Sequence, residues 1–529
     1  MKRLVTLTAL SVTAAVAALA LSDAAQAKPF RWASSGDIQI LDPYSQNESF
    51  TNAANGQVYE KLTRRGKDLK MGPGLATSWE QTGPLTWRFK LRAGVKFHDG
   101  STLTADDVVF SVKRASGATS QIAIYATAVG EAKRIDDLTV DFVMTKPNPT
   151  FLDHIDSIFV MSKAWCEKNN AVAALDFKNK QEMYTAMNMN GTGPYVLKSR
   201  APGIKTVFGL NPNYWGKVEG NVTEIIYTPI GSNGTRMAAL MSGEIDFVLD
   251  PPPQDVTRLR GRPEVKIVDG MENRVIFIGM DQARDELLYS DVKGKNPFKD
   301  QRVRKALYQA IDIETMKTRL MRNQAVITGG NSPSPLAAYN DPEIESRYPF
   351  DIAASKKLLA DAGYPNGFGF TLDCPNDRYV NDEEICQALG AMWAQIGMKV
   401  KVNAMPKVNY FAKTEKLDTS VYMLGWGGAV TDAETVLTPV LRNRGPNGQG
   451  TYNWGNYKND KLDSLAAQST VETDMKKREA LVKAALREHK EQVHHIPLHR
   501  QMIPWAARAN IDVVHRPDNW MEIGWVTVK

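Results

Sequence analysis

The sequence predicts an α/β protein with mixed sheets, in a chain that is too long for one hydrophobic core. Two observations support this prediction. Segments with the two-residue period of strands alternate with segments that have the 3.6-residue period of helices. In addition, a chain of roughly 500 residues exceeds the length at which single cores usually divide, so we expect two lobes.

The first 27 residues have the composition of a cleaved secretory signal. Lys2 and Arg3 precede an apolar stretch over residues 4–21, and the small-residue motif Ala25-Gln26-Ala27 follows it. No later stretch approaches the roughly 20 apolar residues of a membrane span. No cysteine lies near the cleavage site to carry a lipid. We therefore expect a soluble protein exported to the periplasm.

A strand followed by a helix is predicted early in the mature chain. Over residues 85–91, apolar side chains alternate with polar ones, which is typical of a half-buried strand. Turn residues follow. Thr104 and Asp107 then have the spacing of a capping box, so we expect a helix to begin there and to continue through Val112.

The second half of the chain repeats this mixture. Val303, Leu307 and Ile311 form one helical stripe within residues 301–320. Short apolar runs that alternate with helical stretches predict further buried strands. The other predicted helices are residues 353–362 and 384–396, and the predicted strands are residues 370–373, 400–402 and 421–424.

Cysteine content and charge limit the possible functions. The chain has three cysteines, and after export Cys374 and Cys386 could form a disulfide, which their spacing permits without requiring. Cys166 would then be left over. The formal net charge of +6 is dispersed, with no run of five like charges, so nothing in it predicts nucleic-acid binding.

The chain lacks the local motifs of common hydrolases and nucleotide-binding enzymes. No G-x-S-x-G, H-E-x-x-H or G-x-x-x-x-G-K-[ST] motif occurs. The segment HHIPLHR places His494, His495 and His499 close together, and imidazoles at this spacing could bind a transition metal. Because Pro497 interrupts the segment, we favour surface histidines where a helix runs into a strand, and we expect no metal or cofactor.

Three aromatic residues lie beside turn residues instead of within apolar stripes. Trp426 is flanked by Gly425, Gly427 and Gly428, so its ring could stand at a strand end as a wall for a ligand. Trp454 and Tyr44 also lie in loop-like segments. Each could be an ordinary core residue, but together they are typical of the lining of a cleft.

Several motifs together resemble the extracellular solute-binding proteins of family 5, which include dipeptide- and oligopeptide-binding components of ABC importers. The motifs follow the order of that family from about residue 60 to residue 430. They are GLATSWE, FKLRAGVKFHDGSTLTADDVVFSV, NGTGPYVL, NPNYWG, LMSGEIDFV, FKDQRVRKALYQAIDIETM, IAASKKLLADAGYPNGF and GWGG.

The resemblance implies a two-lobed periplasmic binding protein of the type II-like, cluster C class, with mixed sheets and hinge strands. On this basis the signal peptide occupies residues 1–27. The N-terminal lobe comprises residues 28–272 and 500–529 and contains an extra subdomain at about residues 62–190. The C-terminal lobe comprises residues 273–499.

The resemblance also implies a function without catalysis. Such a protein traps a peptide or another small organic solute between its lobes and delivers it to an inner-membrane ABC permease. We expect a monomer. The alternatives are a receptor for a metal chelate or haem, a secreted hydrolase, and a periplasmic sensory or chaperone-like protein.

Family members also suggest ligand-binding residues. The segment NDRYVND matches the stretch whose arginine pairs with the ligand carboxylate, here Arg378, and a guanidinium can bind a carboxylate through two parallel hydrogen bonds. In dipeptide-binding relatives, an aspartate three positions after Trp426 pairs with the ligand amine, but here that position is Ala429. Asp432 could replace it, or could instead cap the helix that begins near Glu434.

Overall fold

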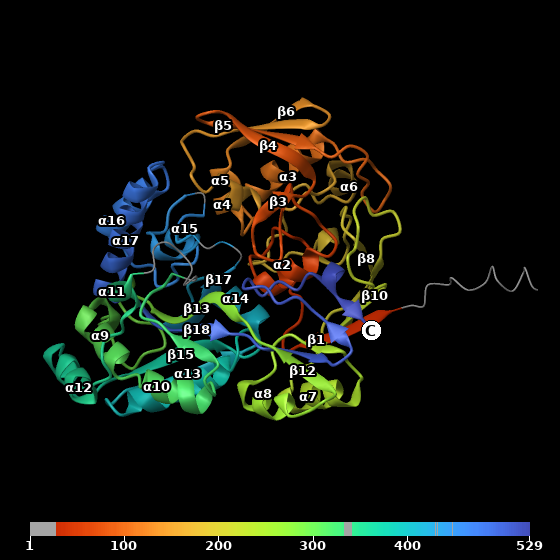
Figure 1. The fold of residues 1–529 in the computed structure, drawn as a ribbon. Helices are drawn as coiled ribbons and strands as arrows, with labels where there is room; N and C mark the ends of the chain where they lie inside the picture. The colour runs from red at the N-terminus through yellow and green to blue at the C-terminus, as the bar shows by residue number, and fades with distance from the viewer. Residues whose placement is uncertain (1–27, 333–340, 429, 431, 447) are drawn as a thin grey trace, which may run out of the picture.

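Two large sheets dominate the computed structural model, which describes residues 28–332, 341–428, 430, 432–446 and 448–529 (Figure 1). The first sheet has seven strands in the order β12-β19-β11-β1-β10-β9-β8. We call the part of the molecule around it the first lobe. Its strands are β1 (Pro29–Ser34), β8 (Tyr195–Ala201), β9 (Lys205–Leu210), β10 (Glu224–Pro229), β11 (Phe247–Val248), β12 (Val265–Val268) and β19 (Trp505–Arg508).

The second sheet has six strands in the order β14-β18-β13-β17-β15-β16, and the structure around it is the second lobe. Along β13, Ile276 and Ile278 join one hydrophobic cluster while Val275 and Phe277 join another, so both faces of this sheet are covered. This explains why its strands read as continuous apolar runs. Its strands are β13 (Met271–Met280), β14 (Ala325–Ile327), β15 (Gly369–Pro375), β16 (Lys399–Met405), β17 (Val421–Gly427) and β18 (His495–Met502).

The chain passes between the two sheets twice. It leaves the first sheet after Val268 and enters the second at Met271, and it returns between Met502 and Trp505. Both passages therefore lie beside the central strands β13 and β18, which pair with each other. The mixed α/β class is confirmed, whereas the division of the chain at residues 272 and 499 stays a prediction.

A third sheet lies in the orange segment at the top of Figure 1, in the order β4-β5-β7-β6. The predicted strand at residues 85–91 is β5, and its alternating face packs in a cluster around Phe89 and Phe142. The predicted capping box is also present, because the backbone N–H of Thr104 donates to the Asp107 carboxylate at 2.9 Å. The elements here are β4 (Ala76–Gly83), β5 (Thr86–Leu91), β6 (Glu131–Asp136), β7 (Thr139–Val143), α3 (Ala105–Ala115), α4 (Ala123–Ala128) and α5 (Phe151–Ile155).

The predicted helix over residues 301–320 is wrong as a single element. Helix α9 (Gln301–Gln309) ends early, and α10 (Ile313–Thr315) continues into the π-helical turn η3 (Met316–Leu320). The cause is local, because the Asp312 side chain accepts the backbone N–H of Thr315 and so starts a new helix. The other predicted helices and strands of this lobe occur close to their predicted bounds, as α12 (Ile352–Asp361), α13 (Asp382–Ala394), β15, β16 and β17.

The remaining elements are mostly helices that surround the sheets. None of the described helices combines the length and apolar character that crossing a membrane requires. The helices are α2 (Ser49–Asn55), α6 (Lys163–Lys168), η1 (Tyr184–Ala186), α7 (Asn233–Ser242), α8 (Pro253–Arg260), η2 (Pro297–Lys299), α11 (Pro342–Glu345), α14 (Lys407–Thr414), α15 (Glu434–Val436), η4 (Leu437–Leu441), α16 (Asp460–Ser469), α17 (Met475–Glu491) and η5 (Ile523–Trp525), and the small ladders are β2 (Thr63–Arg65) with β3 (Met71–Pro73) and β20 (Ile511–Asp512) with β21 (Thr527–Val528).

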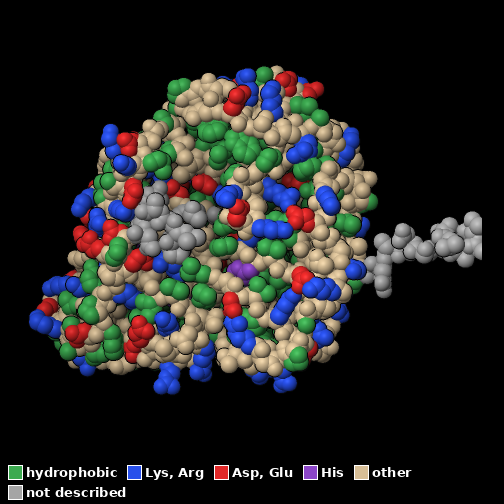
Figure 2. Space-filling view, viewed as in Figure 1, with side chains coloured by type: hydrophobic (Ala, Val, Ile, Leu, Met, Phe, Trp, Pro, Cys, Tyr) green, Lys and Arg blue, Asp and Glu red, His purple; other side chains and the backbone are tan. Residues whose placement is uncertain are grey.

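Charged side chains on the face drawn in Figure 2 are of mixed sign. Lys and Arg side chains lie next to Asp and Glu over most of this face, without a broad field of one charge. The arrangement agrees with the dispersed charge of the sequence.

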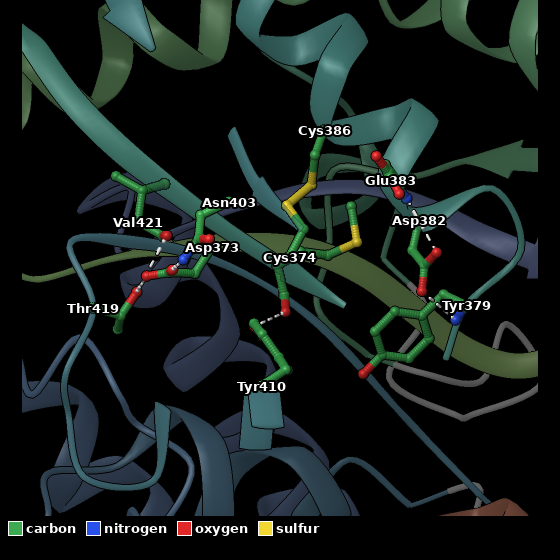
Figure 3. Close-up of a disulfide and its surroundings, with 11 residues drawn as sticks. Asp373, Cys374, Tyr379, Asp382, Glu383, Cys386, Asn403, Tyr410, Thr419 and Val421 are labelled. Atoms are coloured by element: carbon green, nitrogen blue, oxygen red, sulfur yellow. Dashed lines mark hydrogen bonds between the residues drawn. A yellow bond between two sulfur atoms is a disulfide. The ribbon is translucent and has the colours of Figure 1, made fainter. Parts of the chain in front are cut away.

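A disulfide joins Cys374 at the end of β15 to Cys386 in α13 (Figure 3). Cys166 is free and buried. We expect replacement of both bonded cysteines by serine to lower the free energy of unfolding by about 2–3 kcal/mol, because the unfolded chain loses a closed loop. Urea denaturation with and without a reductant measures this. The reductant should destabilise the wild type and leave the double variant unchanged, and an insensitive wild type would contradict the prediction.

Candidate functional site

Two connected cavities lie between the lobes. The smaller, of about 80 Å³, is lined by Arg378 and Trp426 and is called here the Arg378 cavity. The larger, of about 200 Å³, is the Lys61 cavity. The two share the lining residues Asn47, Ser49, Tyr125 and Gly427.

The Arg378 cavity has walls from both lobes, so closing or opening of the lobes changes its volume. Its first-lobe residues precede and begin α2, and Tyr125 comes from α4. Its second-lobe residues come from β13, the β15–α13 loop, α14 and the end of β17. The complete lining is Gln39, Gln46, Asn47, Glu48, Ser49, Tyr125, Arg274, Arg378, Tyr379, Phe411, Glu415, Leu424, Gly425, Trp426, Gly427 and Tyr452.

The loop that carries Arg378 is fixed at its base. The Asp382 carboxylate, at the start of α13, accepts the backbone N–H groups of Arg378 and Tyr379, each at 2.9 Å. Figure 3 shows the bond to Tyr379. Burial raises the pKa of Asp382 to about 8, although these hydrogen bonds oppose the shift. The Cys374–Cys386 disulfide ties the strand before this loop to the helix after it. The arginine therefore projects from an anchored backbone.

Glu48 of the first lobe forms ion pairs with two cations of the second lobe. Its carboxylate lies 3.0 Å from Arg378 Nε and 3.5 Å from Lys407 Nζ, and all three side chains are buried. Burial opposes ionisation of Glu48, but Lys407 and Arg378 outweigh it and lower its pKa to about 2. Glu48 also accepts the backbone N–H of Thr51 at 2.8 Å and so begins α2.

The outer end of the Arg378 guanidinium has no hydrogen-bond partner among the described residues. Nε lies 3.0 Å from the Glu48 carboxylate but does not form a hydrogen bond with it, and the group lies over the Tyr379 ring at 4.8 Å from the ring centroid. The second arginine of this cavity, Arg274, is committed to protein groups: it pairs with Glu272 and donates to Gly425 O and to Ser49 Oγ. Arg378 is therefore the arginine of this cavity that can bind a carboxylate through two parallel hydrogen bonds.

Trp426 lines the same cavity, but its ring is largely covered. It remains within β17, donates from Nε1 to the carbonyl of Thr435, and has a neighbouring ring, Tyr452, at 4.6 Å between centroids. Only 8% of the residue is exposed. Its indole is thus a fixed wall and not the bare ring that the glycines suggest.

The flanking glycines are required by close packing. A Cβ at Gly425 would lie 2.6 Å from the Tyr379 ring, and one at Gly427 would lie 1.8 Å from the carbonyl oxygen of Asn273 on β13. A larger residue at either position would push the strand away from its neighbours. The GWGG motif therefore brings the strand end close to the cavity.

Tyr44 and Trp454 do not line either cavity. Tyr44 is fully buried in the first lobe, donates to the carbonyl of Phe159 and lies under the Arg114 guanidinium. Trp454 is fully buried among aromatic rings of the second lobe, including Tyr410 and Tyr422. In the structure both are core residues, which is the alternative to a cleft position that their sequence context also allows.

Asp432 also has a protein partner. Its two carboxylate oxygens lie 2.6 and 2.8 Å from the Arg478 guanidinium, and one of them accepts the backbone N–H of Glu434 at 2.8 Å. Asp432 therefore has the helix-capping role that the sequence left open, and it lines neither cavity. Ala429, the position of the family aspartate, lies outside the described residues.

Several residues of the Arg378 cavity were not predicted. Glu48 could have been found from the pattern NESF, in which an acidic residue directly precedes a short helix, but this pattern indicates a cap and not a ligand site. Tyr125 and Tyr452 lie in unremarkable helical and loop sequence. Glu415 follows α14 and has no local motif. Only the tertiary fold brings these four residues together.

The Lys61 cavity combines aromatic rings with a cation that has no acidic side chain within ion-pair distance among the described residues. Lys61 Nζ lies 5.0 Å from the Phe159 ring centroid and 4.8 Å from that of Trp520, and burial lowers its pKa. Glu60 accepts hydrogen bonds from Thr192, Tyr214 and Trp215, and burial raises its pKa to about 7. This cavity can accommodate further polar parts of a solute.

The histidines of HHIPLHR are buried, so the expectation of surface histidines is wrong. α17 does run into β18, but the chain folds His495 against His489, with 2.8 Å between ring nitrogens. Burial lowers the pKa of His499 to about 4 and that of His495 well below its ordinary value. None of these histidines lines either cavity, and no group of three His, Cys, Asp or Glu among the described residues is placed to hold a metal.

Comparison with known proteins identifies the family. Residues 70–448 match the model described as "Bacterial extracellular solute-binding proteins, family 5 Middle". The chain belongs to this family. It is 26% identical over 464 residues to heme-binding protein A of Haemophilus influenzae, covering 82% of this chain and 80% of that protein. It is 26% identical over 480 residues to the glutathione-binding protein GsiB of Escherichia coli, covering 88% of each.

Solved family 5 structures share the fold. The periplasmic binding protein DppA of Helicobacter pylori, in complex with the peptide STSA, has 22% identity and a TM-score of 0.83, with 95% of this chain and 98% of that chain covered. A dipeptide-binding protein of Pseudoalteromonas in complex with Met-Leu has 20% identity and a TM-score of 0.83, covering 95% and 100%. The two-lobed binding-protein fold is thereby confirmed, and family 5 members are solute-binding proteins.

Proposed function

We infer that the protein is the solute receptor of an ABC importer and binds a peptide or related small organic solute between its lobes. The observation that carries this inference is the interlobe cavity in which the Arg378 guanidinium leaves its outer nitrogens unpaired. A carboxylate placed there gains two charge-assisted hydrogen bonds in a site that excludes water. Trp426 and Tyr452 supply an apolar wall beside it.

Contacts across the cleft suggest how binding is coupled to closure. Glu48 joins Arg378 and Lys407, and His154 of α5 lies 2.9 Å from Glu434 of α15. These groups come from opposite lobes, so they favour the closed arrangement of the molecule. A solute that adds contacts to both walls favours closure further, by the free energy that it gains only in the closed form.

The cellular setting is also part of the proposal. Residues 1–27 direct export to the periplasm, and the closed, loaded receptor docks on an inner-membrane ABC permease. His494, His495 and His499 lie in the second-lobe core and line neither cavity, so they are not placed to bind a haem or a metal chelate there.

Native mass spectrometry of the protein purified without unfolding tests the function. We expect a small molecule to be retained and to be released unchanged on denaturation. Small-angle scattering of the stripped protein should show compaction when that molecule is restored. Steady conversion of the molecule into a product, without compaction, would contradict the receptor function and favour the hydrolase.

A further inference from the structure

A carboxylate of the Arg378 cavity, that of Glu415, lacks a protein partner. Glu415 follows the last turn of α14 and lines the cavity together with Phe411, Trp426 and Tyr452. Its Oε2 atom is buried and has no hydrogen-bond partner, and no cation lies within ion-pair distance of it among the described residues. Burying a carboxylate without a partner is costly, so this arrangement requires an explanation.

Three other carboxylates that line the two cavities have protein partners. Glu48 has two cations, Glu60 has three hydrogen-bond donors, and Glu434 has His154. Among the described residues that line either cavity, Glu415 alone has a buried carboxylate oxygen without a hydrogen bond. A solute cation could therefore satisfy this buried oxygen without breaking a protein contact.

The charged groups around Glu415 do not neutralise it. Burial dominates and raises its pKa to about 7, while Lys178 and Arg444 lower the pKa and Asp176 raises it. Lys178 and Asp176 belong to the first lobe, so the carboxylate faces the cleft. Arg444 directs its guanidinium to the carbonyls of Gly450 and Thr451. A cation from solution would thus find an acceptor that the protein has left available.

We propose that the Glu415 carboxylate receives the cationic group of a solute whose carboxylate binds Arg378. This inference rests on the proposed function and names its solute class: small molecules that carry an ammonium or guanidinium group as well as a carboxylate. Trp426 lies in the same wall and would contact the part of the solute between its two charges.

The test uses the full mature protein and a library of unmodified di- to tetrapeptides, screened by thermal shift. The tightest binder is then compared with its N-acetyl and C-terminal amide forms by calorimetric titration. Glu415→Gln should weaken binding of the free-amine peptide by about tenfold to a hundredfold, the effect of losing a hydrogen bond between charged groups. It should leave binding of the N-acetyl form unchanged. Glu131→Gln, an exposed site in β6, controls for the loss of one negative charge.

A pH series adds a readout that packing alone would not change. With a Glu415 pKa of about 7 in the free protein, affinity for the free-amine peptide should rise about fourfold between pH 6 and pH 8, because ionisation of the carboxylate favours binding while the peptide α-amine, with an ordinary pKa of about 8, begins to lose its proton. Glu415→Gln should abolish this rise.

The outcomes separate the two proposals. Equal affinities of wild type and Glu415→Gln for a free-amine peptide, with the same pH dependence, would overturn the role of Glu415 and leave the receptor function standing. Absence of binding by every library peptide, with a retained molecule that lacks a cationic group, would also overturn the solute class. Retention of any unchanged molecule would still support the receptor.

Discussion

Arg378→Ala should weaken binding of a carboxylate solute by about 2–5 kcal/mol, the largest effect on affinity that we expect from one substitution. The arginine is buried, its backbone is held by Asp382, and its outer nitrogens face the cavity without partners. Removing it leaves the solute carboxylate buried without a counter-charge. Calorimetric titration with the tightest library peptide measures the loss.

Controls distinguish recognition from damage to the fold. Arg378→Lys keeps the charge but loses the planar fork, so it should fall between wild type and alanine. Arg258→Ala, on the exposed part of α8, should leave affinity unchanged. If the C-terminal amide of the peptide loses as much affinity as the free acid in Arg378→Ala, the arginine does not bind the carboxylate.

Asp42→Ala should lower the free energy of unfolding of the first lobe by about 3–5 kcal/mol, the largest effect on stability that we expect. Asp42 and Arg114 form a completely buried ion pair, and the Asp42 carboxylate also accepts from Thr185 at 2.7 Å. Without Asp42, the guanidinium is left buried beside Tyr44. Urea denaturation followed by tryptophan fluorescence measures the change, and Asp68→Ala, in an exposed pair with Lys70, should have little effect.

The Asp42–Arg114 ion pair also predicts that the free energy of unfolding depends on pH in the acid range. Burial opposes ionisation of Asp42, but the hydrogen bonds and charge of Arg114 outweigh it and hold the Asp42 pKa below its ordinary value. Its stabilisation is therefore complete above the ordinary pKa of an aspartate and is lost as the pH falls through the lower folded pKa. Asp42→Ala should remove this part of the acid transition, and an unchanged acid profile would contradict the assignment.

Local patterns in the sequence predicted the elements that depend on local chemistry. The capping box at Thr104 and the alternation over residues 85–91 reappear as α3 and β5. The break at Asp312 was missed because the apolar stripe continues through it, while the side chain of that residue starts a new helix. The periodicity of apolar residues indicates which face of a helix is buried, but it does not by itself indicate where the helix ends.

The candidate site was predictable only in part. Arg378 and Trp426 belong to family motifs, and the structure places both on one cavity. Tyr44 and Trp454 have similar local sequence but lie in cores, since a ring beside a turn can point inward as readily as into a cleft. Glu48 and Glu415 carry no local pattern, and their roles follow from partners that are distant in sequence.

By itself, the sequence determined that this is an α/β chain of the family 5 solute-binding proteins, and it predicted export and an arginine, Arg378, as a carboxylate-binding residue. Only the tertiary structure decided which side chains share the cavity, which charges are already paired and which carboxylate is left without a partner. The reason is physical: periodicity and capping act over a few residues, whereas desolvation and ion pairing depend on groups brought together from both lobes.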